Sequence, residues 1–223
     1  MRRSGILLHI SSLPGPYGIG TFGPYARQFV DRLKEAGQTW WQILPLGPTS
    51  YGDSPYQTFS AFALNPYFID PDTLAGEGLL LKDDLREARH GGHSVDYGWL
   101  HENRLKTLEK AFARFDTDDQ AFRTFLRDNG TWLDDYALFM AIKEDMGGVS
   151  WAEWDDTLRM RDKDTLDDAR ARLGKRVMFH CFLQYMAYTQ WTDLKAYANR
   201  QGVRIIGDMP IYVSFDSSDV WAE

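Results

Sequence analysis

The sequence predicts an α/β protein built on a small parallel β-sheet. An apolar run at residues 5–10 is followed by a helical pattern at 24–36 and a second apolar run at 39–46. A third apolar run, at 203–207, follows a long stretch with helical periodicity. A strand, a helix and a strand of these lengths indicate a parallel βαβ unit, because parallel strands need a crossover connection. We therefore expect three adjacent parallel strands and a mostly helical middle of the chain.

The first elements have recognisable ends. The run at 5–10 is apolar with almost no alternation, which is typical of a buried strand, and two prolines stop it shortly afterwards. The segment 24–36 begins with Pro24, which suits the first turn of a helix, and its apolar residues lie on one face. Gly37 follows and favours a helix end. The second strand is expected at 39–46.

Helical signals fill the middle of the chain. Residues 99–115 and 120–127 have helical periodicity. Asn129-Gly130 is expected to end a helix, and Thr131 opens a capping signal for the next one. A second capping signal begins at Ser150.

Two apolar faces are expected to pack in the core. Residues from Leu133 to Lys143 recur at helical spacing, which predicts a packed face with Lys143 at its edge. Residues 166–200 are expected to form one long helix or two. Its apolar face is interpreted as core and comprises Met178, Cys181, Phe182, Tyr185 and Met186.

The pattern changes from strands to helices near Asp70 and Pro71, which is the candidate domain boundary. We expect a first βαβ part with a ligand-binding loop at 1–70 and a mainly helical subdomain at 71–201. The third strand and the loop after it are expected at 202–223.

Composition narrows the class of partner. The 223 residues are 43% hydrophobic and 26% charged, as in an ordinary globular protein. A net charge of −7 with dispersed basic residues argues against a nucleic-acid partner. No run approaches the ~20 apolar residues of a membrane span. The single cysteine, Cys181, lies among aromatic residues and is expected to be a buried thiol, which fits a reducing compartment. We predict a cytoplasmic protein with no membrane partner.

An aromatic, polar loop follows the second strand. Residues 51–57 read Tyr-Gly-Asp-Ser-Pro-Tyr-Gln, so aromatic rings, a carboxylate, a hydroxyl and an amide stand on a segment stiffened by glycine and proline. Flat aromatic faces cover the C–H faces of a sugar ring, and carboxylates and amides bind its hydroxyls. Loops after parallel strands are where α/β proteins bind ligands. The alternative is a turn whose tyrosines pack on the core.

Other patterns point to competing chemistry. Residues 18–23 have the glycine spacing of a dinucleotide-binding loop, but prolines separate them from the first strand and the second strand ends without an acidic residue. Glycines for a tight turn are the preferred interpretation. His90 and His93 flank two glycines, and two histidines are too few for a zinc site, so a mobile, solvated loop is expected. His9, near the end of the first strand, faces either packing or a ligand.

Several long motifs, in order, resemble one enzyme family. Residues 6–14 are similar to its opening, residues 51–57 and 59–67 to its substrate loop, and residues 207–221 to the segment around a third barrel strand. The chain thereby resembles the amylomaltases, which are 4-α-glucanotransferases. The resemblance covers essentially the whole chain, more loosely in the middle.

The resemblance implies a fold and a reaction. The fold would be the N-terminal part of a (β/α)8 TIM-type barrel with a largely helical insertion between strands 2 and 3. The reaction would transfer a segment of an α-1,4-glucan to the 4-hydroxyl of an acceptor glucan or glucose, with retention. Retention requires a carboxylate nucleophile and a nearby acid/base. No metal or organic cofactor is implied.

The resemblance also assigns roles to residues of this chain. Asp208 corresponds to an acidic residue that lines the subsite where the sugar is attacked and that is not the nucleophile. Tyr56 corresponds to an aromatic residue that stacks on that sugar, and Ser54 to a neighbouring polar contact. Tyr51 and Tyr97 resemble aromatic residues that hold the glucan at a more distant surface. His9 would be a partner of a sugar hydroxyl.

Five aspartates stand in loops or at strand ends: Asp53, Asp70, Asp208, Asp216 and Asp219. For each of these the ordinary interpretation is a turn or a helix cap. Asp208 is the exception, because it follows an apolar strand and such a position in a barrel faces the active site.

The sequence departs from the family at its end. The family's nucleophile and acid/base are expected beyond Glu223, and only three strands are found where a barrel needs eight. The chain is therefore expected to be part of a longer product or to need a partner, and to be inactive alone. A glucan-binding module is the non-enzymatic alternative. An α-amylase relative is the other, but Met209-Pro210 follows Asp208 where that family usually has asparagine and histidine.

Overall fold

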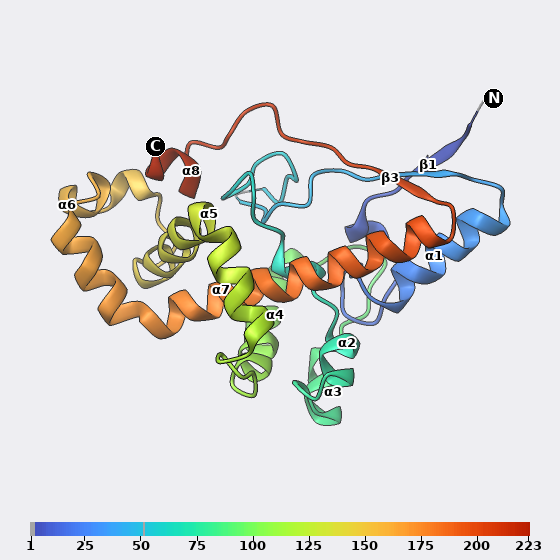
Figure 1. The fold of residues 1–223 in the computed structure, drawn as a ribbon, viewed down its shortest axis with the longest axis horizontal. Coiled ribbons are helices and arrows are strands. Elements are labelled where there is room, and N and C mark those ends of the chain that lie inside the picture. Colours follow the sequence, from blue (N-terminus) through green and yellow to red (C-terminus); the bar gives the residue numbers. More distant parts are fainter. Residues whose placement is uncertain (1–2, 51) are drawn as a thin grey trace. The chain divides into compact units, whose positions relative to one another are not determined.

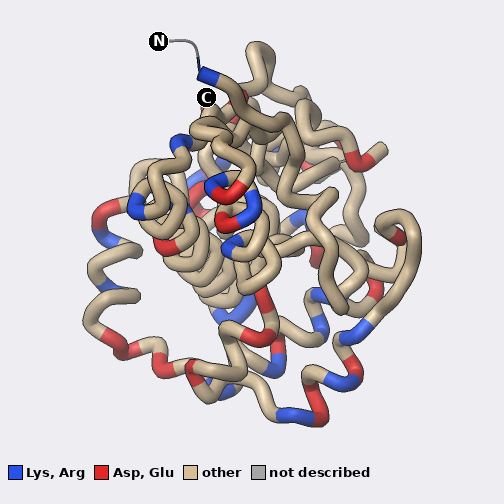
Figure 2. The backbone as a smooth tube through the Cα atoms, turned by 90° about the vertical axis from the view of Figure 1, so that its right-hand side faces the viewer, with Lys and Arg blue, Asp and Glu red and all other residues tan. Residues whose placement is uncertain are grey.

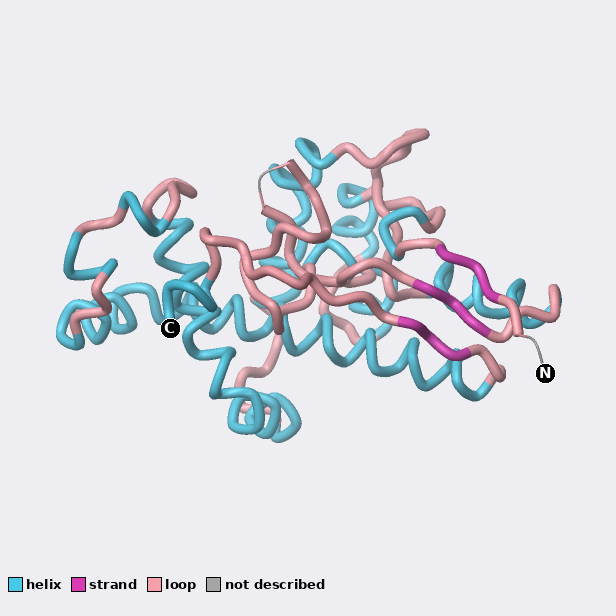
Figure 3. Tube along the Cα trace, turned by 90° about the horizontal axis from the view of Figure 1, so that it is seen from above, coloured by secondary structure: helices cyan, strands magenta, loops and turns pink. Residues whose placement is uncertain are grey.

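The three apolar runs form one parallel sheet in the computed structural model, which describes residues 3–50 and 52–223. Strands β1 (Gly5–Leu7), β2 (Trp40–Gln42) and β3 (Arg204–Ile206) lie in the order β1-β2-β3. Both neighbouring pairs are parallel, and Figure 3 shows the three strands side by side. The predicted parallel arrangement is confirmed, with strands shorter than the apolar runs.

The chain forms two compact units. The first unit comprises Met1–Pro45, Asn65–Phe115 and Met186–Met209, and the second comprises Leu46–Leu64, Asp116–Tyr185 and Pro210–Glu223. This grouping differs from boundaries near residues 70 and 201, because the backbone passes between the units several times. The change of pattern at Asp70 marks only the start of the short helix α2 (Pro71–Gly76).

The long helix α7 (Lys163–Arg200) begins in the second unit and ends in the first, and Figure 1 draws it as one continuous helix in orange. Of the two alternatives for this stretch, the single helix is the observed one. Of the face that helical periodicity predicted as core, Cys181, Phe182 and Met186 are buried, whereas Met178 and Tyr185 are half-buried.

The first unit also contains helices and short 3-10 turns. The bounds are α1 (Pro24–Glu35), α3 (Lys82–Ala88), α4 (Tyr97–Phe112), η1 (Ile10–Ser12) and η2 (Pro66–Phe68). The predicted helix at 24–36 is confirmed. It ends at Glu35, and Gly37 follows the C-cap Ala36 with a φ of 69°, in the left-handed region that glycine adopts readily.

The buried carboxylate of Asp70 connects several of these elements. Its Oδ1 accepts hydrogen bonds from Thr73 N at 2.8 Å and from Thr73 Oγ1 at 2.9 Å, which caps α2. Its Oδ2 accepts from Thr21 Oγ1 at 2.6 Å. Gln190 on α7 accepts from the Asp70 backbone N–H at 2.6 Å. A β-carbon added to Gly23 would lie 2.1 Å from Asp70 Cγ, so glycine is required there by close packing and not by a nucleotide.

The second unit is helical. It holds α5 (Gln120–Asp145), η3 (Trp151–Glu153), α6 (Asp156–Arg159), the first part of α7, and α8 (Ser218–Ala222). The predicted cap at Ser150 is confirmed, because its side chain accepts from Ala152 N. One core cluster of this unit is formed by Leu138, Phe139, Ile142, Trp154, Leu166, Ala169 and Trp221.

The helix break expected at Asn129-Gly130 is wrong, because α5 runs through it. An interior glycine costs about 1 kcal/mol relative to alanine, whereas burying a single large apolar side chain contributes about 1.5–3 kcal/mol. Phe122, Leu133 and Phe139 are all fully buried along this helix. The Asn129 amide donates to Phe125 O at 2.9 Å, so the side chain bonds within the helix.

The first strand was expected to be buried, and this expectation is wrong for its three paired residues. Ile6 is 43% exposed and Leu7 is 57% exposed, and burial begins at His9. On β3, Ile206 is 42% exposed. These side chains are exposed because no other part of the described chain covers them.

No helix in the described part of the chain is both long and apolar enough to cross a membrane. Acidic and basic residues are interspersed along the backbone in Figure 2. The dispersed charge agrees with the pattern read from the sequence, whereas the absence of a nucleic-acid partner stays a prediction.

We predict that Gly23→Ala destabilises the first unit. The added methyl group must displace the Asp70 carboxylate from its bonds with Thr21 and Thr73, and overpacking of this kind costs about 1–3 kcal/mol. Gly76→Ala is the matched control, since nothing lies within 4 Å of a β-carbon there and no positive φ is involved. Chemical denaturation measures both variants. Equal stability of Gly23→Ala and the wild type would contradict the required close packing.

Candidate functional site

His9 lies just past the carboxyl end of β1 and is buried. Its Nδ1 accepts a hydrogen bond from Leu44 N at 3.3 Å, which places the ring proton on Nε2. The ring meets Phe68 edge-on, with centroids 5.4 Å apart. Burial lowers the pKa of His9 to about 4, so the imidazole is neutral at pH 7. The contacts with Phe68 and Leu44 N thus explain part of the environment of the His9 ring. A role of His9 in ligand binding stays a prediction.

Asp208 lies beyond the carboxyl end of β3, two residues after Ile206, and is exposed. Its Oδ1 accepts from the N–H of Met209 at 2.9 Å. Ile43 N donates to Ile206 O at 3.0 Å, which holds the end of β3 against the segment after β2. Asp208 and His9 therefore follow strands of the same parallel sheet, at the end where such folds bind ligands.

Ser54 and Tyr56 belong to a closed loop of the second unit. Thr49 and Thr58 form an antiparallel bridge at its base, and Ser50 N donates to Gln57 O at 3.0 Å. Within the turn, Tyr56 N donates to Ser54 Oγ at 3.3 Å. The Tyr56 side chain is 46% exposed, so the packing alternative does not account for the whole of its ring. Tyr51 lies outside the described residues.

Tyr97 is the first residue of α4 and belongs to the first unit. The preceding Asp96 caps the helix by accepting from Trp99 N at 2.9 Å. Tyr97 is half-buried. Of the predicted site residues, His9, Asp208 and Tyr97 thus lie in the first unit, and Ser54 and Tyr56 lie in the second.

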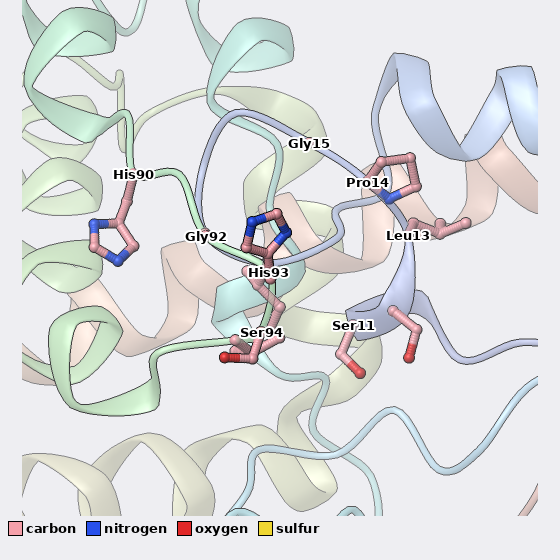
Figure 4. A pocket seen from close by; sticks show the side chains of 12 residues that line it. Ser11, Leu13, Pro14, Gly15, His90, Gly92, His93 and Ser94 are labelled. Atoms are coloured by element: carbon pink, nitrogen blue, oxygen red, sulfur yellow. The ribbon is translucent and has the colours of Figure 1, made fainter.

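A pocket of about 360 Å³, which sequence analysis did not predict, lies within the first unit. In the view of Figure 4, His93 and Ser94 lie between His90 on one side and Ser11 on the other. The lining is rich in hydroxyl, imidazole and backbone groups and comprises Ser11, Ser12, Leu13, Pro14, Gly15, Gly18, Ile19, His90, Gly92, His93, Ser94 and Val95.

The loop that carries the two histidines is attached at His90. Its N–H donates to Pro16 O at 2.9 Å, and its ring stacks on Trp99 with centroids 4.2 Å apart. His93 is exposed. The expectation of a solvated loop therefore fits His93 but is wrong for His90. In the described ranges, no group of three or more His, Cys, Asp or Glu is placed to hold a metal ion.

Asp70, Asp216 and Asp219 accept hydrogen bonds from distant parts of the chain. Asp70 caps α2, as described above. Asp216 accepts from Lys143 Nζ at 2.6 Å, and Asp219 accepts from Ala61 N at 2.7 Å. Burial raises the pKa of Asp219, and the bonds from Ala61 N and Ser60 Oγ oppose that rise. The interpretation as a helix cap is therefore confirmed for Asp70. Asp216 and Asp219 link segments that are distant in the sequence.

The geometry defines an α/β protein with polar and aromatic side chains beyond the carboxyl ends of parallel strands. The family model described as 4-alpha-glucanotransferase matches residues 8–223. The 4-alpha-glucanotransferase of Clostridium butyricum is 50% identical over 218 residues, which cover 96% of this chain and 45% of that protein. The enzyme of Thermus thermophilus with the same description is 48% identical over 228 residues, which cover 99% of this chain and 45% of that protein.

A solved structure, amylomaltase from Streptococcus agalactiae in complex with acarbose, matches with a TM-score of 0.94 at 48% identity. The match covers 99% of this chain and 46% of that chain. The chain therefore belongs to the 4-alpha-glucanotransferase family, and its fold is that of the corresponding part of an amylomaltase. It spans about half the length of the curated relatives it matches, 45% in each of the two relatives above.

We predict that His9 makes the protein less stable below neutral pH. The imidazole ordinarily has a pKa of 6.5, and burial lowers it to about 4. The unfolded chain therefore binds the proton first, so stability is complete above pH 6.5 and is lost as the pH falls toward 4. The loss is roughly 3 kcal/mol, at 1.36 kcal/mol per pH unit.

Urea denaturation between pH 7 and pH 4.5 measures this dependence. His9→Asn keeps a hydrogen-bond acceptor for Leu44 N but cannot titrate, so its stability should change less over this range. His93→Asn, at an exposed histidine, should follow the wild type. Parallel curves for the wild type and His9→Asn would show that His9 is not the buried titrating group.

Proposed function

We propose that a protein carrying this chain, together with the remaining length seen in its relatives, is a 4-α-glucanotransferase. It transfers a segment of an α-1,4-glucan to the 4-hydroxyl of an acceptor glucan or glucose, with retention of configuration. The main support is the TM-score of 0.94, at 48% identity, to an amylomaltase whose structure holds acarbose, a maltooligosaccharide analogue. We expect no metal or organic cofactor. A cytoplasmic location also stays a prediction.

We infer that the three strands belong to a (β/α)8 barrel and that residues 71–201 are a helical insertion between strands 2 and 3. The supporting observation is that the described elements between β2 and β3 are all α-helices or 3-10 turns. In this assignment 1–70 is the first βαβ part, and 202–223 is the third strand with its loop. The exposed apolar side chains of β1 and β3 fit a sheet that further strands would extend and cover.

We assign Asp208 to the subsite where the sugar is attacked. A carboxylate at a strand end can bind two sugar hydroxyls, and such bonds strengthen as the ring becomes oxocarbenium-like. Its exposure and its position after β3 support this role. Tyr56 stacks on the same sugar, Ser54 shapes its turn and contacts a hydroxyl, and His9 offers its Nε2 proton at the same end of the sheet.

Tyr97, with Tyr51, is assigned to a more distant surface that holds the rest of the glucan. The half-buried ring of Tyr97 at the start of α4 supports this role, because its position is fixed by the helix cap.

We propose that the nucleophile and the acid/base lie outside these 223 residues. A retaining mechanism needs two carboxyl groups about 5 Å apart. Asp70, Asp216 and Asp219 already bind structural partners, which makes them poor candidates. The chain alone would then bind maltooligosaccharide weakly or not at all and would show no transfer. A non-catalytic glucan-binding module is the second candidate function, which the exposure of Tyr56 supports.

The test is disproportionation of maltotriose. We expect the longer protein to produce glucose and longer oligomers, and the 223-residue chain to produce neither. Asp208→Asn in the longer protein should lower turnover more than it weakens ground-state binding, which also excludes a contaminating enzyme. Glucose released by the 223-residue chain, and abolished by a mutation within it, would place the catalytic carboxylates here after all.

We predict that Tyr56→Ala in the longer protein lowers kcat/KM for maltotriose at least about tenfold. Covering one face of a sugar ring with an aromatic side chain is worth on the order of 1–3 kcal/mol, and 1.4 kcal/mol corresponds to tenfold. Tyr25→Ala, at another exposed tyrosine, is the matched control and should leave the kinetics unchanged. Kinetics unaffected by the loss of Tyr56 would remove this residue from the site.

A further inference from the structure

A buried lysine is paired with an aspartate in the second unit. Lys143 lies on α5, and its side chain is 7% exposed. Its Nζ donates to Asp216 Oδ2 at 2.6 Å and to Val149 O at 3.0 Å. Nζ also lies 5.1 Å from the centre of the Phe59 ring and 5.8 Å from that of Phe139. One cation thus contacts the segment after α5, the segment after β3 and the loop that follows β2.

Asp216 connects this lysine to a further segment. Its Oδ1 accepts from Trp151 N at 3.2 Å, at the start of η3. Trp151 Nε1 in turn donates to Phe215 O at 2.7 Å, and the centroids of the Trp151 and Phe215 rings lie 5.1 Å apart. The segment around residues 215–216 is therefore held from two sides, by a side-chain charge and by the indole.

The residues after Asp216 hold the loop that carries Tyr56. Ser218 donates to Phe59 O twice, from its N–H at 2.8 Å and from its hydroxyl at 3.1 Å. Asp219 accepts from Ala61 N at 2.7 Å. Phe59 N donates to Pro48 O at 3.2 Å, which closes the loop at its base. The contacts therefore run from Lys143 through the 216–219 segment to both ends of the loop.

Stability alone does not require such a pair. Replacing a buried ion pair with apolar side chains is often neutral or stabilising, because the desolvation of two charges offsets their attraction. The charged pair instead specifies one arrangement of the 215–219 segment. The aspartate accepts from both Lys143 and Trp151, so it fixes the register of the 215–219 segment in a way that apolar packing does not.

We propose that Lys143 and Asp216 form a positioning pair for the Tyr56 loop, setting where Ser54 and Tyr56 are presented to a glucan. Lys143 touches no substrate in this proposal and acts through Asp216 and the 216–219 segment. The consequence for sugar binding rests on the proposed function, whereas the effect on the loop does not.

The first experiment measures amide hydrogen exchange of the loop in the longer protein, without glucan. Lys143→Met keeps the side-chain length and removes the charge, and Asp216→Asn keeps the shape. Asp216 is 29% exposed in its side chain, so water reaches the charge left behind by Lys143→Met. We expect exchange at residues 49–50 and 52–61 to become at least tenfold faster in both variants. Lys163→Met, which breaks the exposed Lys163–Asp167 pair, should change nothing in the loop.

The second experiment is a double-mutant cycle on maltotriose kinetics. We expect Lys143→Met to lower kcat/KM at least tenfold in the wild type and to have little further effect in a Tyr56→Ala background, because the two changes act on one loop. If Lys143→Met instead caused a general loss of folding, kcat/KM would fall by the same factor in the wild type and in the Tyr56→Ala background. If Lys143→Met does not fold, Asp216→Asn carries the same cycle.

The outcomes separate the two proposals. Unchanged loop exchange in both variants, or kinetic losses that add fully to Tyr56→Ala, would overturn the positioning pair. Faster loop exchange in a protein that shows no transfer on maltotriose would leave the pair standing and contradict the glucanotransferase assignment.

Discussion

The buried carboxylate of Asp70 is the constraint on which the first unit depends. It receives hydrogen bonds from Thr21, in the loop between β1 and α1, and from Thr73, in the first turn of α2. Its backbone bonds Gln190 on α7. Asp70 is almost fully buried, and burying a carboxylate without hydrogen-bond partners costs folding free energy. The glycine at position 23 follows from the same requirement, since a side chain there would occupy the space of the carboxylate.

The aspartates of this chain show how environment sorts one residue type into different roles. Asp70, Asp216 and Asp219 each accept hydrogen bonds from distant segments, and these bonds account for their positions. Asp208 follows the end of a strand and is exposed, where a ligand can reach it. The sequence could separate Asp208 from the others only through the apolar strand before it. The structural partners of the other three come from elsewhere in the chain.

Local signals predicted the elements whose causes are local. The three apolar runs, Pro24 and Gly37 at the ends of α1, and the cap at Ser150 each depend on a few neighbouring residues. The failures have nonlocal causes. Asn129-Gly130 lies inside α5 because buried residues on both sides outweigh an interior glycine, and β1 is exposed because the described chain does not cover it. Among the candidate site residues, the strand-end positions of His9 and Asp208 were predictable. The pocket beside His93 was not, because it depends on two loops about 80 residues apart in the sequence.

The end of α5 shows why the role of Lys143 escaped sequence analysis. Helical spacing placed it at the edge of a packed face, yet it is buried against a partner 73 residues away. The next residue, Glu144, points to α7, where it contacts Arg176 and lies with Oε1 3.2 Å from His180 Nε2. Burial would raise the pKa of Glu144, but the nearby His180 and Arg176 outweigh burial and hold the pKa at about 2. Adjacent residues on a helix point about 100° apart, so consecutive charges bind different segments. Lys143 binds Asp216 in the segment after β3, and Glu144 binds Arg176 on α7. The end of α5 therefore fixes the position of both segments.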